Sequence, residues 1–233
     1  MIGGATRLVG LIGDPVSGSL SPRMQNAAFA ARGLDWAYVP LPVAGARLED
    51  AIRGLVALGF AGANVTAPHK EAAARLCDEA EEESVNTLVV RDGRVVGSNT
   101  DREIVAGLPA ERVCLIGAGG AAKALLPDLR GEVRIFSRSG DWPPEAGGCA
   151  VIVNATPVRD ELLVQPERGQ AVVDLAYSPD GAETALVGAA RAAGCDPIVD
   201  GLEALVRQGA ASFERWTGVP APVDVMRAAV RSG

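Results

Sequence analysis

A glycine-rich turn between a short strand and a helix constrains this fold more than any other feature of the sequence. Residues 113–116 read Val-Cys-Leu-Ile and run directly into Gly117-Ala118-Gly119-Gly120-Ala121-Ala122. In this pattern, G-x-G-x-x-A, the first glycine permits a tight turn and the second lets backbone amides approach a pyrophosphate. Ala122 is small enough for close packing of helix on sheet, and a helix N-terminus favours negative charge. The sequence therefore predicts a dinucleotide-binding site at Gly117, Ala118, Gly119, Gly120 and Ala121.

Apolar runs and helical segments alternate along the second half of the chain. Runs at 133–136, 150–153 and 172–175 join 113–116 as short strands suited to a parallel sheet, and helical segments lie near 120–130 and 182–193. This alternation predicts an α/β protein with a Rossmann-like, doubly wound domain. We expect that domain to cover residues 102–204.

The residues after the run 133–136 indicate which dinucleotide binds. An NAD-specific site usually has an Asp or Glu there, which binds the ribose hydroxyl. This chain has Ser137-Arg138-Ser139 instead, and an arginine can pair with a 2′-phosphate and stack on adenine. The alternative interpretation is a surface arginine in a loop, and the nearby Asp141 counts slightly against NADP. On balance the pattern favours NADP as the cofactor.

The first hundred residues also predict alternating strands and helices. Runs at 8–12, 36–43 and 58–65 are typical of strands, and residues 21–32 and 48–58 have helical period. Ser21 is a suitable N-cap and Pro22 a suitable first residue for the first of these helices. Asp92-Gly93 joins the runs 87–90 and 94–97, which is a strong signal for a hairpin.

Lys70 is one of only two lysines among 233 residues. It ends the stretch Asn64-Val65-Thr66-Ala67-Pro68-His69-Lys70, in which a strand is expected to end near Val65 and Pro68 to open an Ala-rich helix. Sites in α/β proteins are commonly built at such corners. An ammonium can release a proton during a reaction, whereas a guanidinium cannot. Lys70 is therefore a candidate catalytic residue; the alternative is a surface lysine in the first turn of a helix.

Two further polar clusters occur in the first domain. Ser19 and Ser21 lie in a hydroxyl-rich turn before a helix, which suits a ligand carrying a carboxylate. Asn86 precedes one strand of the hairpin and Asp101 follows the other, so both are expected at the same end of the hairpin and could converge on one cleft. Capping alone explains Ser21 adequately and Ser19 less well. Taken singly, Asn86 and Asp101 are each more often turn or cap residues.

Composition excludes several classes of protein. The formal net charge of −7 argues against a general nucleic-acid or anionic-membrane binder. No apolar run approaches the length of a membrane span, and the N-terminus lacks the pattern of a signal peptide. The four cysteines are widely spaced without paired-ligand spacing, so we expect reduced core residues of a cytoplasmic protein and no metal site.

The motifs together resemble the shikimate dehydrogenase family, which includes quinate/shikimate relatives. In chain order they read S-x-S-P, N-V-T-x-P-x-K, V-N-T, N-T-D, G-A-G-G-A-A, N-A-T-P and G-L-x-x-L-V-x-Q, from Gly13 to about Trp216. The resemblance implies a substrate domain at 1–101 completed by C-terminal helices at 205–233, with the NADP domain inserted between them. It also implies the reversible reduction of 3-dehydroshikimate to shikimate by NADPH, in the pathway to the aromatic amino acids.

The resemblance implies a role for each matching residue. Lys70 and Asp101 match the catalytic pair, and Ser19 and Ser21 match the groups that hold the substrate carboxylate. Substrate contacts are implied for Thr66, Asn86, Asp101, Tyr177 and Gln208, and cofactor contacts for Gly117 to Ala121, Ser137, Arg138, Ser139, Thr156 and Gly201. Hydride arriving at a ring carbonyl builds negative charge on its oxygen, which a positioned proton donor must neutralise. Which of Lys70 and Asp101 transfers that proton is left open.

The chain departs from the family pattern mainly at the cofactor end. Residues 139–148 form a short Pro/Gly-rich loop where the family has a helix and more, and Arg159 stands where Gly-Met is expected. His69, the only histidine, occupies a variable position, and we interpret it as a bystander. The alternatives to an NADP-dependent shikimate dehydrogenase are a quinate/shikimate or aminoshikimate dehydrogenase using NAD or NADP, and a non-catalytic dinucleotide-binding paralogue. We expect a small-molecule substrate and a monomer or homodimer.

Overall fold

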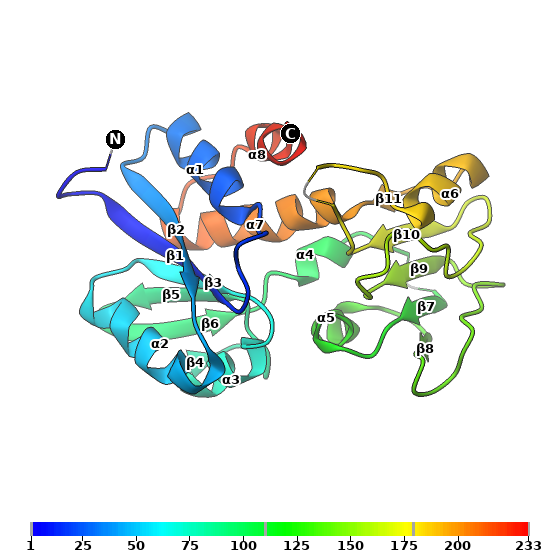
Figure 1. The fold of residues 1–233 in the computed structure, drawn as a ribbon, viewed down its shortest axis with the longest axis horizontal. Helices are drawn as coiled ribbons and strands as arrows, with labels where there is room; N and C mark the ends of the chain where they lie inside the picture. The colour runs from blue at the N-terminus through cyan, green and yellow to red at the C-terminus, as the bar shows by residue number, and fades with distance from the viewer. Residues whose placement is uncertain (1, 110, 179, 233) are drawn as a thin grey trace. The chain divides into compact units, whose positions relative to one another are not determined.

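The computed structural model describes residues 2–109, 111–178 and 180–232. The chain forms two compact units: residues up to Thr100 together with Val206–Ser232, and Asp101–Leu205. Each unit has one β-sheet with helices (Figure 1), which confirms the α/β class. Asp101, expected at the end of the first domain, groups with the second unit.

The first unit contains a six-stranded sheet of order β2-β1-β3-β5-β6-β4. Its elements in chain order are β1 (Arg7–Gly13), α1 (Ser21–Ala31), β2 (Trp36–Pro42), η1 (Gly45–Arg47), α2 (Leu48–Ala57), β3 (Gly62–Val65), α3 (Lys70–Leu76), β4 (Glu79–Ala80), β5 (Thr87–Arg91) and β6 (Arg94–Ser98). Two C-terminal helices follow, α7 (Gly201–Thr217), whose first residues belong to the second unit, and α8 (Val223–Arg231). Strands β1, β2 and β3 are parallel, while β5 is antiparallel to both β3 and β6.

Helices cover both faces of this sheet (Figure 1). α2 and α3 pack on one face, where Ile52 and Ala73 join Val65 and Leu88 in a buried apolar core. α1, α7 and α8 cover the other face, where the rings of Phe29 and Phe213 stack with centroids 5.3 Å apart. Burial of large side chains of this kind stabilises a fold by about 1.5–3 kcal/mol each, so the C-terminal helices are an integral part of the unit.

The hairpin expected around Asp92-Gly93 is confirmed. β5 and β6 pair in antiparallel register, with Thr87 opposite Ser98. Asp92 and Gly93 have φ values of 52° and 76°, as a two-residue type I′ turn requires. The register brings the start of β5 and the end of β6 to the same edge of the sheet.

Three local expectations were wrong. Leu58 does not open a buried strand: α2 ends at Ala57, Leu58 is 75% exposed, and Gly59 at φ 71° ends the helix before β3 begins at Gly62. Pro68 does not open α3, which starts two residues later at Lys70. Ser21 is not an N-cap but the first residue of α1, and its backbone N–H donates to Ser19 Oγ at 3.2 Å.

The second unit contains a five-stranded parallel sheet of order β11-β10-β9-β7-β8. Its elements are α4 (Arg102–Val105), β7 (Val113–Ile116), α5 (Gly120–Leu125), η2 (Leu126–Asp128), β8 (Val133–Phe136), β9 (Val151–Asn154), β10 (Ala171–Asp174), α6 (Ala185–Ala193) and β11 (Ile198–Val199). The expected doubly wound arrangement is thereby confirmed. Side chains alternate between the faces, with Val113 and Leu115 packing under α4 and α5, and Cys114 and Ile116 on the face of α6.

The loop between β8 and β9 helps to cover the α6 face of this sheet. Residues 137–150 contain no helix, which confirms the short loop expected from the sequence. Ala146 and Cys149 are each 4% exposed and belong to the core that contains Phe136 and Ile152. The loop is therefore a packed layer of the unit.

Three of the four cysteines are confirmed as core residues. Cys114, Cys149 and Cys195 are buried and Cys77 is half-buried, all as free thiols. Burial raises the pKa of Cys114 to about 12 and that of Cys77 to about 11, so both stay protonated at neutral pH. Within the described residues no group of three His, Cys, Asp or Glu side chains could hold a metal ion. The helices described by the structure include none with the length and apolar character of a membrane span.

Candidate active site

The polar residues expected to bind substrate in the first unit lie at one edge of its sheet. β1 and β3 are parallel neighbours, so the turn after Gly13 and the corner after Val65 emerge at the same edge. Asn64 is opposite Thr87 across the antiparallel β3–β5 pair, which brings Asn86 to that edge as well. Binding sites of open α/β sheets form outside the carboxyl ends of parallel strands, and this edge is such a place.

The Thr66–Lys70 corner is held tightly against the turn after β1. The Thr66 N–H donates to Ile12 O at 2.8 Å, and a Cβ added to Gly13 would overlap the Thr66 methyl group. His69 is 3% exposed, and its Nε2 lies 2.6 Å from Val43 O. The histidine therefore anchors the corner. Lys70 is the half-buried first residue of α3.

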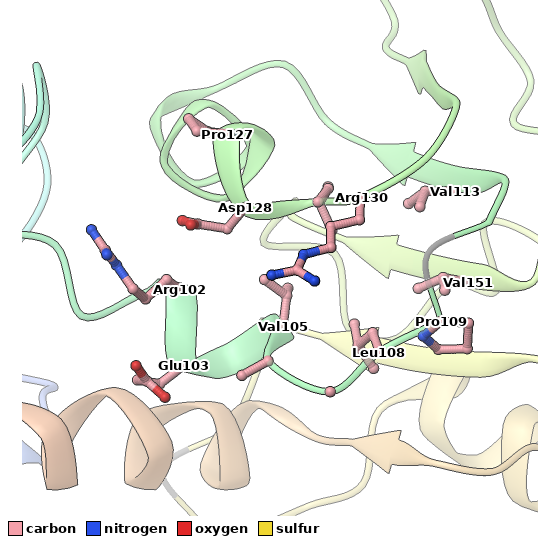
Figure 2. Close-up of a pocket in the computed structure, with 13 residues that line it drawn as sticks. Arg102, Glu103, Val105, Leu108, Pro109, Val113, Pro127, Asp128, Arg130 and Val151 are labelled. Atoms are coloured by element: carbon pink, nitrogen blue, oxygen red, sulfur yellow. The ribbon is translucent and has the colours of Figure 1, made fainter.

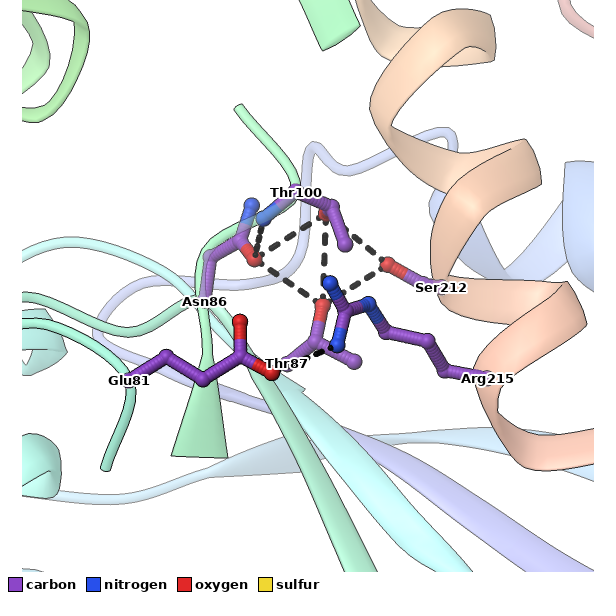
Figure 3. A network of polar contacts seen from close by, with 6 residues as sticks. All are labelled: Glu81, Asn86, Thr87, Thr100, Ser212 and Arg215. Atoms are coloured by element: carbon purple, nitrogen blue, oxygen red, sulfur yellow. Dashed lines mark hydrogen bonds and ion pairs between the residues drawn. The ribbon is translucent and has the colours of Figure 1, made fainter. Parts of the chain in front are cut away.

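Asn86 is oriented by a buried network of hydroxyl groups (Figure 3). Asn86 Oδ1 accepts hydrogen bonds from Thr100 N at 2.9 Å, Thr100 Oγ1 at 3.0 Å and Thr87 Oγ1 at 2.9 Å. Ser212 on α7 completes the network, with its Oγ 2.8 Å from Thr87 Oγ1 and 3.1 Å from Thr100 Oγ1. These acceptor contacts fix the rotamer of Asn86 and define which end of its amide carries the oxygen.

The same network attaches α7 to the sheet. Ser212 Oγ also donates to Gln208 O at 3.0 Å and accepts from Asn64 Nδ2 at 3.0 Å. At the rim, Arg215 Nη1 lies 3.1 Å from Glu81 Oε1 (Figure 3). Gln208, the substrate residue expected on the C-terminal helices, is thus one helical turn from the Asn86 network.

The second unit gathers its expected site residues at the carboxyl ends of its parallel strands. Gly117 follows β7, and its φ of 113° is a conformation that suits glycine. A Cβ at this position would lie 3.1 Å from Ala155 O and 3.2 Å from Thr156 Cγ2, so the turns after β7 and β9 touch. Gly201 is similarly close to the turn after β10, since a Cβ there would lie 2.9 Å from Tyr177 Cβ.

The glycine-rich turn leaves space in front of α5. A Cβ added to Gly119 or Gly120 would meet no atom within 4 Å. The turn is therefore open where these side chains would stand, and the G-x-G-x-x-A pattern predicts that a pyrophosphate binds the backbone amides there.

A buried carboxylate organises the turns after β9 and β10. Asp174 is 0% exposed, and its Oδ1 accepts from Asn154 Nδ2 at 2.9 Å and from Ala176 N at 3.1 Å. Its Oδ2 accepts from Thr184 Oγ1 at 2.6 Å, at the start of α6. Asn154 in turn accepts from Thr156 N and Oγ1 at 3.0 and 2.7 Å. Burial raises the pKa of Asp174, although these hydrogen bonds oppose the shift.

Ser137, Arg138 and Ser139 form a turn at the end of β8. Gly140 N donates to Ser137 O and Ser137 N donates to Asp141 O, each at 3.0 Å. Ser137 Oγ and Ser139 Oγ lie 3.3 Å apart. The exposed Arg138 guanidinium carbon lies 5.8 Å from the ring centroid of Trp142.

Comparison with known proteins gives the family. The model of the "Shikimate dehydrogenase substrate binding domain" matches residues 11–88, and that of the "Shikimate 5'-dehydrogenase C-terminal domain" matches residues 201–231. A protein of Rubrobacter xylanophilus named shikimate dehydrogenase (NADP(+)) is 43% identical over 283 aligned positions, which cover 98% of this chain and 97% of the relative. The chain belongs to the shikimate dehydrogenase family. The resemblance seen in its motifs is thereby confirmed.

Solved structures of this family have the same fold. A shikimate dehydrogenase crystallised in complex with NADP+ matches with a TM-score of 0.87 and 32% identity, covering 99% of this chain and 96% of the other. A quinate dehydrogenase of Corynebacterium glutamicum in complex with NAD matches with a TM-score of 0.83 and 26% identity, covering 98% and 99%. The Rubrobacter alignment, at 283 positions, is longer than the 233 residues of this chain, so this family member lacks segments that its relative has.

Figure 2 shows a cavity of about 390 Å³ in the second unit, whose lining contains none of the residues expected to bind the cofactor. It is lined by Val113 and Val151, the first residues of β7 and β9, and by Arg102, Asp128 and Arg130. The glycine-rich turn follows the last residue of β7. The cavity is therefore at the amino ends of the strands, opposite the edge where dinucleotides bind in this fold.

Sequence reasoning missed the residues that orient the site from behind. Ser212 and Tyr38 lie in no motif and, together with Thr100 of the N-T-D motif, support Asn86 and Asn64. Tyr38 Oη donates to Asn64 Oδ1 at 2.9 Å. Asp174 and Thr184 support the turn that carries Thr156. The N-V-T, N-T-D and N-A-T-P motifs contain some members of these hydrogen-bond networks. The other members are single residues that belong to no local sequence pattern.

Proposed function

We propose that this protein is an NADP-dependent shikimate dehydrogenase, which catalyses the reversible reduction of 3-dehydroshikimate to shikimate in the pathway to the aromatic amino acids. The observation that carries the proposal is the edge of the first sheet, where the Thr66–Lys70 corner, the Ser19–Ser21 turn and Asn86 occur together. Membership of a family whose members are named for this NADP-dependent activity supports it.

Ser19 and Ser21 are proposed to hold the substrate carboxylate. Ser19 Oγ accepts from the Ser21 N–H, so its own O–H proton is directed elsewhere and can be donated to a carboxylate oxygen. Thr66, Asn86, Tyr177 and Gln208 are proposed to contact the ring hydroxyls. For Asn86 the three hydrogen bonds accepted by Oδ1 support a fixed orientation of the side chain.

Lys70 and Asp101 are proposed as the catalytic pair. Bound NADPH supplies hydride to the ring carbonyl carbon of the substrate. A lysine ammonium placed at the carbonyl oxygen would neutralise the charge that develops there by giving up a proton, and would take it back in the oxidation direction. Asp101 is proposed to orient this ammonium and to share the proton with it. The tight packing of the corner before Lys70 supports such a role, because a proton donor must be held in place.

The residues of the second unit fit an NADP molecule. The proposed contacts are Gly117 to Ala121 and Thr156 on the pyrophosphate and nicotinamide side, Gly201 near Tyr177, and Ser137, Arg138 and Ser139 at the 2′-phosphate. The open space in front of Gly119 and Gly120 supports the first group. The Ser137–Asp141 turn supports the second, because it presents two hydroxyls and a guanidinium together.

The second candidate is a quinate or shikimate dehydrogenase that uses NAD. The likeness to a quinate dehydrogenase in complex with NAD and the short loop at 137–150 favour it. A spectrophotometric assay of shikimate and quinate, each with NADP and NAD, separates the two. Faster turnover of shikimate with NADP is expected; faster turnover of quinate with NAD would overturn the first proposal. We further propose that the enzyme acts in the cytoplasm as a monomer or homodimer.

A further inference from the structure

Trp142 is an unusual surface residue. It is 40% exposed and is the only aromatic among the large hydrophobic side chains that the described residues leave exposed. It lies in the loop that follows β8, directly after the Ser137–Asp141 turn. An exposed indole ring offers a flat apolar face on which a planar base can stack.

The loop holds Trp142 between two fixed points. On one side the Ser137–Asp141 turn is closed by two backbone hydrogen bonds of 3.0 Å. On the other side Gln170, only 5% exposed, donates from Nε2 to Ala146 O at 2.9 Å and to Cys149 O at 2.8 Å. Ala146 and Cys149 are themselves buried under the sheet. The ring is therefore presented from a short, anchored segment.

The Trp142 ring lies close to the guanidinium of Arg138, the residue expected to bind the 2′-phosphate. The Arg138 guanidinium carbon is 5.8 Å from the Trp142 ring centroid, within the range of a cation–π contact. Among the strands that the structure describes, β8 is the outermost of its sheet and pairs with β7. In dinucleotide-binding folds the end of this strand meets the adenosine ribose, so the aromatic ring and the guanidinium occur together where the base and its 2′-phosphate must lie.

We propose that Trp142 is the adenine-binding wall of this enzyme, presented by the loop between β8 and β9. The ring stacks on the purine, while Arg138 beside it pairs with the 2′-phosphate. Base–aromatic stacking of this kind is worth about 1–3 kcal/mol by alanine substitution, which corresponds to about 5- to 150-fold in a dissociation constant. The proposal rests on NADP as the cofactor of the proposed function.

Binding measurements without substrate test this inference apart from catalysis. The dissociation constants of NADPH, NADH, adenosine 2′,5′-bisphosphate and reduced nicotinamide mononucleotide are measured by calorimetry for wild type, Trp142→Ala, Trp142→Leu and Trp142→Phe. We expect Ala and Leu to weaken the three adenine-containing ligands by about 5- to 150-fold and Phe to restore most of the affinity. The mononucleotide, which has no adenine, is expected to bind all four proteins equally.

Leu126→Ala is the matched control. Leu126 is 37% exposed in the same unit, but it lies beyond the C-terminal end of α5, away from the glycine-rich turn. Its replacement is expected to leave all four constants unchanged. Wild-type affinity for adenosine 2′,5′-bisphosphate in Trp142→Leu would overturn the inference, as would an equal loss of mononucleotide binding. A wild-type protein that binds no nicotinamide nucleotide would instead overturn the proposed function.

Discussion

Removing the hydroxyl of Ser212 tests whether the buried network behind Asn86 supports substrate binding. Ser212 is 0% exposed, and its Oγ lies within 3.1 Å of polar atoms of Asn64, Thr87, Thr100 and Gln208. Ser212→Ala removes these contacts and changes little else, because alanine is a good helix former at a mid-helix position. The size of the effect depends on how many hydrogen bonds of this network the substitution removes.

The geometry predicts a moderate loss of stability for Ser212→Ala. Each partner keeps another contact: Thr87 and Thr100 retain Asn86 Oδ1 at 2.9 and 3.0 Å, and Asn64 Nδ2 retains Asn86 O at 3.0 Å. No partner is left buried without a hydrogen bond, so the larger penalty for an unsatisfied group does not apply. At a net of roughly 0.5–1.5 kcal/mol per hydrogen bond, we expect the free energy of unfolding to fall by about 1–2 kcal/mol. For a chain of this size that lowers Tm by about 2–8 °C.

The functional effect should appear in KM for shikimate. Gln208 is one turn from Ser212, and the Asn86 rotamer depends on the two threonines that Ser212 contacts. We expect KM to rise several-fold while kcat stays within about twofold, since the catalytic pair is untouched. Thermal unfolding followed by circular dichroism and steady-state kinetics measure the two effects, with Ser232→Ala, at an exposed position, as the control. An unchanged Tm together with an unchanged KM would refute the reasoning, and a selective loss of kcat would assign Ser212 a different role.

Three further changes probe other parts of the account. Burial raises the pKa of Asp174, so its contribution to stability is present below the unfolded pKa of about 3.9 and is lost as pH rises through the folded value. Urea unfolding should therefore show the free energy of unfolding of Asp174→Asn rising relative to that of wild type as pH rises from 4. A pH-independent difference between the two proteins would contradict this. Gly62→Ala would place a Cβ against Leu88 O and 2.6 Å from Trp216 Nε1, so differential scanning calorimetry should show destabilisation by about 1–3 kcal/mol, and an unchanged unfolding temperature would count against the close packing of α7. Arg138→Ala should weaken NADP binding by about 10- to 100-fold, as expected for charge-assisted hydrogen bonds to phosphate, and leave NAD binding unchanged in a titration; equal NADP affinity would remove the 2′-phosphate assignment.

Periodicity predicted most of the fold because the strands and helices are locally encoded. The run 113–116 and the Asp92-Gly93 turn carry their own signals, and both appear as expected. The start of β3 was placed too early because Leu58 is apolar yet 75% exposed, with the chain reversing at Gly59 before the strand begins at Gly62. In this case a backbone conformation, which hydrophobic pattern does not report, decided the boundary.

The site could be predicted only as far as its motifs reach. Lys70, Asn86 and the glycine-rich turn lie in contiguous patterns whose chemistry is readable. Ser212 joins Asn64 from 148 positions away, and a lone serine in a helix gives no sign of such a partner. The same holds for Trp142, whose relation to Arg138 depends on how the loop turns at Ser137–Asp141.

The central claim is that Lys70 transfers the proton, and substitutions of Lys70 test it most directly. Reduction of NADP by shikimate is followed by absorbance for wild type, Lys70→Ala and Lys70→Arg, with the NADP dissociation constant measured for each. Arginine keeps the positive charge but cannot give up its proton. We predict that wild type reduces NADP and that both variants lose about 10²- to 10⁴-fold in kcat, with NADP affinity unchanged. Turnover of Lys70→Arg equal to wild type, or no reduction of NADP by the wild-type protein, would contradict the account.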